Sequence, residues 1–352
     1  MSEPTTTPAS HDEFPEGTST AIDGGTTSQT PMKRFFASAV GRNSGLIIAL
    51  VVLVILGTVT AGDTFLNLDN LLVILRYASV TGVVAIGVTF VITAGGIDLS
   101  VGSVLGLCSV VASLGAVQTA ASGFWPLMVF VAIATGILAG LVNGLIIAYG
   151  KVVAFMATLA MLVAARGAAE LISQRKTQVI ENDGFLDFFR GDLLGITWVV
   201  WIFALVAVLA WVLLNRTTFG RRTVAIGGNP TASRLAGVNV RRHLVYLYMI
   251  AGASAGIAGV MLLSRTTAGT STHGQLLELD AIAAVVVGGT LLIGGRGTIG
   301  GTVLGMLLFA TLTNLFTQNN LSTSVQLVAK GVIIVVAVLL QQRFVNRESS
   351  GT

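Results

Sequence analysis

The sequence predicts an all-α polytopic membrane protein, and three observations carry that prediction. Of the 352 residues, 53% are hydrophobic and only 10% are charged, whereas charged residues make up about 25% of a typical soluble domain. The mean hydropathy is +0.85. Long apolar runs also recur along the chain with polar loops between them, as expected of helices that cross a bilayer.

Ten apolar runs are candidates for membrane-spanning helices. They fall near residues 44–60, 71–93, 101–121, 125–149, 152–172, 197–214, 244–264, 279–293, 299–316 and 325–341. A helix needs about 20 residues to cross a bilayer, with a range of about 17–25. The runs at 279–293 and 299–316 are short, so we expect half-helices or re-entrant segments there. Counted as full spans the runs give ten transmembrane helices, and we expect eight to ten.

The two ends of the chain differ from this core. Residues 1–32 are rich in Ser, Thr, Pro and Gly, hold five acidic residues and have no Lys or Arg, which predicts a disordered tail. Three basic residues between 33 and 42 come directly before the first apolar run. Because basic residues favour the cytoplasmic side, we place this tail in the cytoplasm. Residues 33–343 then form the transmembrane domain, and residues 344–352 form a second cytoplasmic tail.

The loops carry a charge bias that agrees with cytoplasmic termini. The loop at 215–243 holds six arginines and no acidic residue, so we expect it in the cytoplasm. The loop at 173–196 has mixed charge, and we expect it on the external side.

A short helix with well-defined ends is predicted inside the loop at 215–243. Asn229 is suited to be its N-cap, Pro230 takes its first position and Gly237 ends it. Arg234 and Leu235 lie within it. A short, capped helix on a basic cytoplasmic surface suits the docking of another protein, and the alternative is a plain structured loop.

The stretch at 95–103 interrupts the membrane pattern. It brings Gly95, Gly96, Asp98 and Ser100 between two apolar runs. A charged side chain at the bilayer centre costs about 2.5–3.5 kcal/mol on insertion scales and marks a functional-site hypothesis. Broken helix is tolerated at that depth only where protein or a watery cavity surrounds it. The alternative is a short interfacial loop capped by Asp98.

The glycine pair of this stretch recurs later in the chain. Gly95-Gly96 precedes the stretch GSVLGL at residues 102–107. The pattern recurs 199 residues later, where Gly294-Gly295 precedes GTVLGM at residues 301–306. Apolar segments interrupted by glycine in matching halves of a chain point to a transport pathway. The alternative is a chance recurrence in a chain with 42 glycines.

Three polar residues lie inside apolar runs. Asn143 is suited either to a sugar hydroxyl or to a hydrogen bond with a neighbouring helix, and the helix contact is favoured. Arg166 and Lys330 either line a pathway or extend to the lipid headgroups. Weaker echoes relate Asn143 to Asn314 and Arg166 to Lys330.

Several classes of function are excluded by missing residues. The single cysteine, Cys108, and three scattered histidines build neither a disulfide framework nor a metal site. No phosphate-binding loop and no catalytic constellation is present, so the chain is not expected to be an enzyme or to bind a cofactor. Its basic residues gather in particular loops, which argues against nucleic acid as a partner. Energy for transport would come from an ion gradient or from a partner.

Three motifs resemble those of a known family. Residues 95–103, residues 278–290 continued by 294–298, and residues 220–238 resemble the permease subunits of ribose/xylose-type bacterial ABC sugar importers, within the branched-chain amino acid/ribose permease superfamily. The similarity covers about residues 44–341. The resemblance implies a multi-pass permease in the cell (inner) membrane that translocates a monosaccharide by alternating access.

The resemblance also implies partners. A second permease copy would complete the pathway as a homodimer, an extracytoplasmic substrate-binding protein would deliver the sugar, and a cytoplasmic ABC ATPase would hold ATP-Mg. The helix at 229–237 would couple the chain to that ATPase. Asp98 would either hold its helix break together by accepting backbone N–H bonds, which we favour, or face the cargo. The alternative function is an ion-coupled secondary transporter that uses Asp98 with Arg166 or Lys330 as its proton or ion site.

Overall fold

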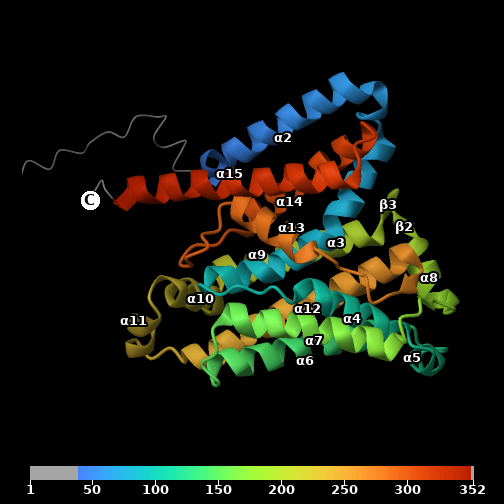
Figure 1. The fold of residues 1–352 in the computed structure, drawn as a ribbon, viewed down its shortest axis with the longest axis horizontal. Coiled ribbons are helices and arrows are strands. Elements are labelled where there is room, and N and C mark those ends of the chain that lie inside the picture. Colours follow the sequence, from blue (N-terminus) through green and yellow to red (C-terminus); the bar gives the residue numbers. More distant parts are fainter. Residues whose placement is uncertain (1–38, 350–352) are drawn as a thin grey trace, which may run out of the picture. The chain divides into compact units, whose positions relative to one another are not determined.

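The fold consists of helices packed side by side, with a few very short strands (Figure 1). The structure, a computed structural model, describes the chain from Ala39 to Ser349, with side chains described for residues 44–333, 335, 336 and 339. Asn43–Thr352 form one unit, and the description below concerns that unit. The predicted tail 1–32 lies outside the described residues.

The elements follow one another in the order α2 (Ala39–Ala61), η1 (Gly62–Thr64), α3 (Leu68–Thr93), α4 (Val101–Ser113), α5 (Gly115–Ala120), α6 (Pro126–Ala148), α7 (Ala154–Ser173), β1 (Gln178–Val179), α8 (Asp183–Arg190), β2 (Asp192–Leu193), β3 (Ile196–Thr197), α9 (Trp198–Arg216), α10 (Thr218–Gly228), α11 (Pro230–Leu235), α12 (Val240–Thr266), β4 (Ala268–Gly269), α13 (Leu277–Val287), α14 (Ile299–Gln318) and α15 (Thr323–Ser349). Strand β1 pairs antiparallel with β4, and β2 pairs with β3. Helices α10 and α11 lie at one end of the long helices, and α5, α8 and the β2–β3 hairpin lie at the other (Figure 1). Helix α15 covers most of the predicted tail 344–352.

The all-α polytopic prediction is confirmed. In the described part of the chain, seven helices are long and apolar enough to cross a membrane: α2, α3, α6, α7, α9, α12 and α14. Each corresponds to one of the predicted apolar runs. Shorter apolar helices accompany them.

Two of the predicted runs differ from expectation. The run at 101–121 is no continuous span, because Leu114 adopts extended ψ (137°) and ends α4 after 13 residues. The run at 299–316, expected to be short, is the full 20-residue helix α14, whose first turn is capped by Thr298. The predicted half-helix at 279–293 is confirmed as α13, which has 11 residues.

Helix α12 occupies the centre of the bundle and packs against α6, α3 and α4. Its contact with α6 depends on glycine. A Cβ atom at Gly136 would overlap the carbonyl oxygen of Gly252, and a Cβ at Gly252 would overlap the carbonyl oxygen of Gly136. Small residues let helix backbones approach closely in lipid, and here they bring the two backbones into direct contact.

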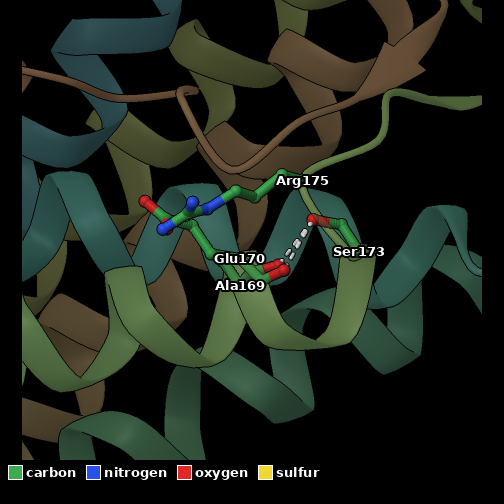
Figure 2. A network of polar contacts seen from close by, with 4 residues as sticks. All are labelled: Ala169, Glu170, Ser173 and Arg175. Atoms are coloured by element: carbon green, nitrogen blue, oxygen red, sulfur yellow. Dashed lines mark hydrogen bonds and ion pairs between the residues drawn. The ribbon is translucent and has the colours of Figure 1, made fainter.

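Helix α7 ends in a hydrogen-bonded turn. The Ser173 hydroxyl donates to the carbonyl of Ala169 over 2.7 Å, and Arg175 forms an ion pair with Glu170 at 2.9 Å (Figure 2). Gln174, the left-handed C-cap of α7, has a φ of 53°, and Arg175 after it has a φ of 58°. Because its side chain is 81% exposed, the ion pair adds little to stability.

The polar loop that follows α7 folds around aromatic residues. Phe185 and Phe189 of α8 are buried, and Trp125 lies against both of them, before the first turn of α6. Phe188 stacks on Trp198 with ring centroids 5.1 Å apart. The acidic residues of α8 face solvent, so this short helix is amphipathic and closes its end of the bundle.

Candidate functional site

The break predicted at 95–103 is a non-helical segment, residues 94–100, between α3 and α4. Within it, Asp98 Oδ1 accepts the N–H of Ser100 at 2.9 Å and the hydroxyl of Ser100 at 2.6 Å. Asn143 Nδ2, from α6, donates to the same hydroxyl oxygen at 2.9 Å. All three residues are at most 2% exposed. Asp98 therefore accepts a backbone N–H inside its own break, as in the favoured interpretation.

Other helices hold the backbone of this segment. The carbonyl oxygen of Ile97 accepts from the hydroxyl of Tyr248 in α12 at 3.3 Å and from that of Thr158 in α7 at 3.4 Å. With Asn143, these residues give the segment polar partners on α6, α7 and α12. Irregular backbone inside a membrane is tolerated where protein buries it or a watery cavity surrounds it. In this segment Asp98 and Ser100 are buried, whereas Gly95 is exposed.

A second irregular segment, residues 270–276, leads into α13. Arg166 of α7 directs its guanidinium to this segment: Nη1 donates to the carbonyl of His273 at 2.9 Å and to the carbonyl of Ser271. Arg166 thus binds backbone carbonyls within the protein. The ring Nδ1 of His273 lies 3.1 Å from the Ser109 hydroxyl of α4, so the segment is tied to α7 and α4 together.

The first turns of α4 and α13 meet at close range. A Cβ atom at Gly102 would overlap Glu278 Oε2 and the carbonyl oxygen of Gly274. Glu278 is 8% exposed, and its Oε2 has no hydrogen-bond partner among the described residues. Negative charge is favoured near a helix N-terminus, and both Asp98 and Glu278 lie near the start of α4.

Lys330 forms an ion pair away from this crossing. Its Nζ lies 2.8 Å from Asp280 Oδ2, and the two side chains are 11% and 21% exposed. The pair joins α15 to α13. Since Arg166 and Lys330 have these other partners, the described residues do not assemble an ion site that pairs Asp98 with either of them.

The two glycine pairs touch each other. A Cβ atom at Gly294 would lie 2.8 Å from the amide nitrogen of Gly95, and the N–H of Gly295 donates to the carbonyl of Thr93 at 2.9 Å. The two glycine breaks predicted from the echoed motif therefore lie against each other. The pairs form one contact at the end of α3.

The short capped helix is confirmed as α11. Asn229 Oδ1 accepts the N–H groups of Thr231 and Ala232 at 3.0 and 2.9 Å, and Pro230 is the first helical residue. Gly237, with a φ of 82°, follows the last turn. The apolar side chain of Leu235 is 86% exposed, and Arg234 beside it is exposed as well.

Glu278, Asp280 and His273 are site residues that the sequence reasoning did not single out. One signal was available for the two acids, because charged residues at the start of an apolar run mark a functional-site hypothesis, as Asp98 does. Their partners, Gly102 and Lys330, lie far away in sequence, and spacing does not reveal such contacts.

A bundle of long apolar helices, interrupted at buried polar segments, defines a polytopic membrane protein of the transport class. Residues 70–338 match the family described as branched-chain amino acid transport system / permease component. The chain belongs to this family and is a multi-pass membrane permease, which confirms the resemblance.

Named relatives extend over nearly the whole chain. The ribose import permease protein RbsC of Bacillus subtilis is 41% identical over 318 residues, which cover 90% of this chain and 97% of the relative. RbsC of Escherichia coli is 38% identical, over 90% of this chain and 99% of the relative. The galactose/methyl galactoside import permease protein MglC of Haemophilus influenzae is 36% identical, over 83% and 92%. No solved structure matches the chain.

Proposed function

We propose that this chain is the membrane-spanning subunit of an ATP-binding-cassette importer that moves a ribose-type monosaccharide into the cell. The relatives support this, since they are named as import permeases for ribose and for galactose/methyl galactoside and match nearly end to end. The sequence has no phosphate-binding loop. ATP-Mg is accordingly bound by a partner ATPase.

The observation that carries the proposal is the surface of α11. An apolar side chain that is 86% exposed, Leu235, projects from a capped helix beside Arg234. Leu235 and Arg234 together offer a partner protein one apolar and one cationic contact on the same short helix. We assign Asn229, Pro230, Arg234, Leu235 and Gly237 to the docking of the ATPase, with the α10–α11 end of the bundle in the cytoplasm together with both termini.

The pathway is assigned to the irregular segments at membrane depth. Gly95, Gly96, Gly294 and Gly295 provide the helix breaks. Asp98, Ser100, Asn143, Arg166 and Lys330 position the elements that border them, through the bonds described above. Interrupted helices that border a central site are typical of transporters. A second copy of the chain completes the pathway, and an extracytoplasmic binding protein supplies affinity for the sugar.

The mechanism we infer is alternating access. ATP binding draws the two ATPase subunits together, α11 moves with them, and the helices rock about the pathway. Because the binding protein selects the cargo, the permease requires no tight sugar site of its own.

Reconstitution tests the proposal. The chain is placed in lipid vesicles with its partner ATPase, with ATP on the ATPase side and the binding protein with labelled ribose on the other. Uptake is expected to require ATP and the binding protein, and to persist when ionophores collapse all ion gradients. Uptake by the chain alone, driven by an ion gradient without ATP, would instead show the ion-coupled secondary transporter.

The cargo is identified on the binding protein. A ligand stabilises the state that binds it, so a thermal-shift screen of monosaccharides ranks the candidates. A shift with ribose and a smaller one with galactose is the expected result. No shift with any monosaccharide, together with a shift for another small polar solute, would overturn the assignment to sugars.

A further inference from the structure

Three segments that are distant in sequence meet at the last turn of α10, just before α11. We call this point the glycine junction and define it as Thr93, Gly95, Gly227, Gly294 and Gly295. A Cβ atom at Gly227, in the last turn of α10, would overlap the carbonyl oxygen of Thr93 and the amide nitrogen of Gly295. A Cβ at Gly294 would lie 2.8 Å from the nitrogen of Gly95 and 3.0 Å from the carbonyl oxygen of Gly227. The contact is therefore backbone on backbone.

Each segment of the junction leads directly to a different moving part of the proposed mechanism. Thr93 and Gly95 open the irregular segment that ends at α4. Gly294 and Gly295 lie in the connection between α13 and α14. Gly227 stands two residues before Asn229, the residue that caps α11. The last turn of α10, which leads into α11, thus contacts both interrupted regions at once.

Helix α10 is fastened to the bundle by a buried side chain and by a contact with α12. Ile226 is 1% exposed, and Thr223 Oγ1 lies 2.8 Å from His243 Nε2 of α12. At the junction, the N–H of Gly295 donates to the carbonyl of Thr93 at 2.9 Å. Close-packed protein interiors transmit strain, because no space is left to absorb it. With no side chain between the backbones, a shift of Gly227 is passed directly to its two neighbours.

We propose that the glycine junction transmits the movement of α11 to the irregular segment 94–100 and to the α13–α14 connection, with Gly227 as the positioning residue. This inference rests on the proposed function, because it requires an ATPase that moves α11. It adds the physical link between that ATPase and the helix breaks.

Two neighbouring glycines provide a matched test. A Cβ atom at Gly227 meets backbone atoms, whereas one at Gly228 meets nothing within 4 Å. Neither residue has a positive φ, so Gly227→Ala and Gly228→Ala change the intrinsic helix propensity alike. Both variants are reconstituted with the ATPase and the binding protein, and sugar uptake is measured per ATP hydrolysed.

The expected result is a loss of coupling confined to one variant. Gly227→Ala is expected to keep its ATPase partner and to hydrolyse ATP at close to the unmodified rate, with uptake per ATP lower by about tenfold or more. Gly228→Ala is expected to match the unmodified chain. An assembled Gly227→Ala protein with unchanged uptake per ATP would overturn the inference. The unmodified complex tests the proposed function separately, because its uptake does not depend on either substitution.

A compensating pair covers the case in which Gly227→Ala does not assemble. A Cβ atom at Gly297 would overlap Thr93 Oγ1 and lie 2.9 Å from Thr93 Cβ, so this clash involves a side chain that can be removed. Gly297→Ala is expected to lower uptake per ATP. The double variant that also carries Thr93→Gly is expected to recover at least half of the uptake per ATP that Gly297→Ala loses. No recovery in an assembled double variant, or a normal coupling ratio in Gly297→Ala alone, would overturn the inference.

Discussion

Asn143 donates its side-chain N–H to the hydroxyl of Ser100 at 2.9 Å, and that hydroxyl donates in turn to Asp98 at 2.6 Å. A helix of the bundle is thereby connected, through one hydroxyl, to the carboxylate that organises the helix break. All three side chains are buried. Loss of one member of such a buried hydrogen-bonded chain lowers the stability of the protein, because the remaining buried groups cannot form replacement hydrogen bonds with water.

Substitution of Asp98 separates its two interpretations. Asp98→Asn keeps an oxygen that can accept from the N–H and the hydroxyl of Ser100, so it is expected to retain uptake within about threefold. Asp98→Ala removes the acceptor, leaves two buried donors unsatisfied and is expected to lower stability by about 1–3 kcal/mol. The measurements are unfolding temperature in detergent and ATP-driven uptake.

One result for Asp98→Asn would support the other interpretation, in which Asp98 faces the cargo. If Asp98→Asn loses uptake as completely as Asp98→Ala while its unfolding temperature stays normal, the negative charge itself is required. Asp98 would then face the cargo or a proton, and the break would be held by its other bonds.

The ion pair between Lys330 and Asp280 is expected to be needed as a pair. Removing one partner leaves a charge in a largely buried place, and such losses reach about 3–5 kcal/mol. Asp280→Ala and Lys330→Ala are therefore each expected to lower the unfolding temperature, whereas the double variant is expected to be more stable than either single one. A double variant whose loss equals the sum of the single losses would show that the two residues act independently.

How far the sequence predicts this molecule depends on the range of the interaction. Apolar runs and the caps of α11 are local signals; seven of the predicted runs are long apolar helices, and the caps of α11 are confirmed. The end of α4 was missed because residues 101–121 contain no charged residue and no proline, so composition does not mark the point where Leu114 leaves helical geometry. The same glycine motif opens α4, with 13 residues, and α14, with 20, so a repeated motif does not fix the length of the helix that follows it.

The contacts in the candidate site were harder to predict from the sequence than the helices were. Arg166 and Lys330 were recognised as charged residues in apolar runs, but their partners were not. Arg166 binds backbone carbonyls of a segment more than a hundred residues away, and carbonyls leave no trace in a sequence pattern. Lys330 pairs with a carboxylate 50 residues earlier. Only the packing of α7 and α15 against the segments around α13 decides between these contacts and the lipid headgroups.

Arg234 is expected to be required for coupling to the ATPase and not for folding. It is exposed on α11, where a reversal of charge changes stability by no more than about 0.5 kcal/mol. The Arg234→Glu variant is expected to insert normally into the membrane, but the ATP hydrolysed by its partner is expected no longer to drive uptake. Arg190→Glu, exposed on α8 at the other end of the bundle, is the matched control. Normal uptake by Arg234→Glu would remove this residue from the docking surface.

Leu235 provides the most direct test of the docking surface. Its side chain is 86% exposed, and Leu194, in the β2–β3 turn at the opposite end of the bundle, is 84% exposed. The two leucines therefore lose similar contacts with solvent or lipid when shortened to alanine. Leu235→Ala is expected to weaken binding of the partner ATPase by about fivefold or more, as for an interface residue worth over about 1 kcal/mol. Leu194→Ala is expected to leave that binding unchanged. The measurement is titration of the purified ATPase onto the reconstituted permease, and equal weakening by both variants would show that exposure alone, and not a docking contact at α11, accounts for the effect.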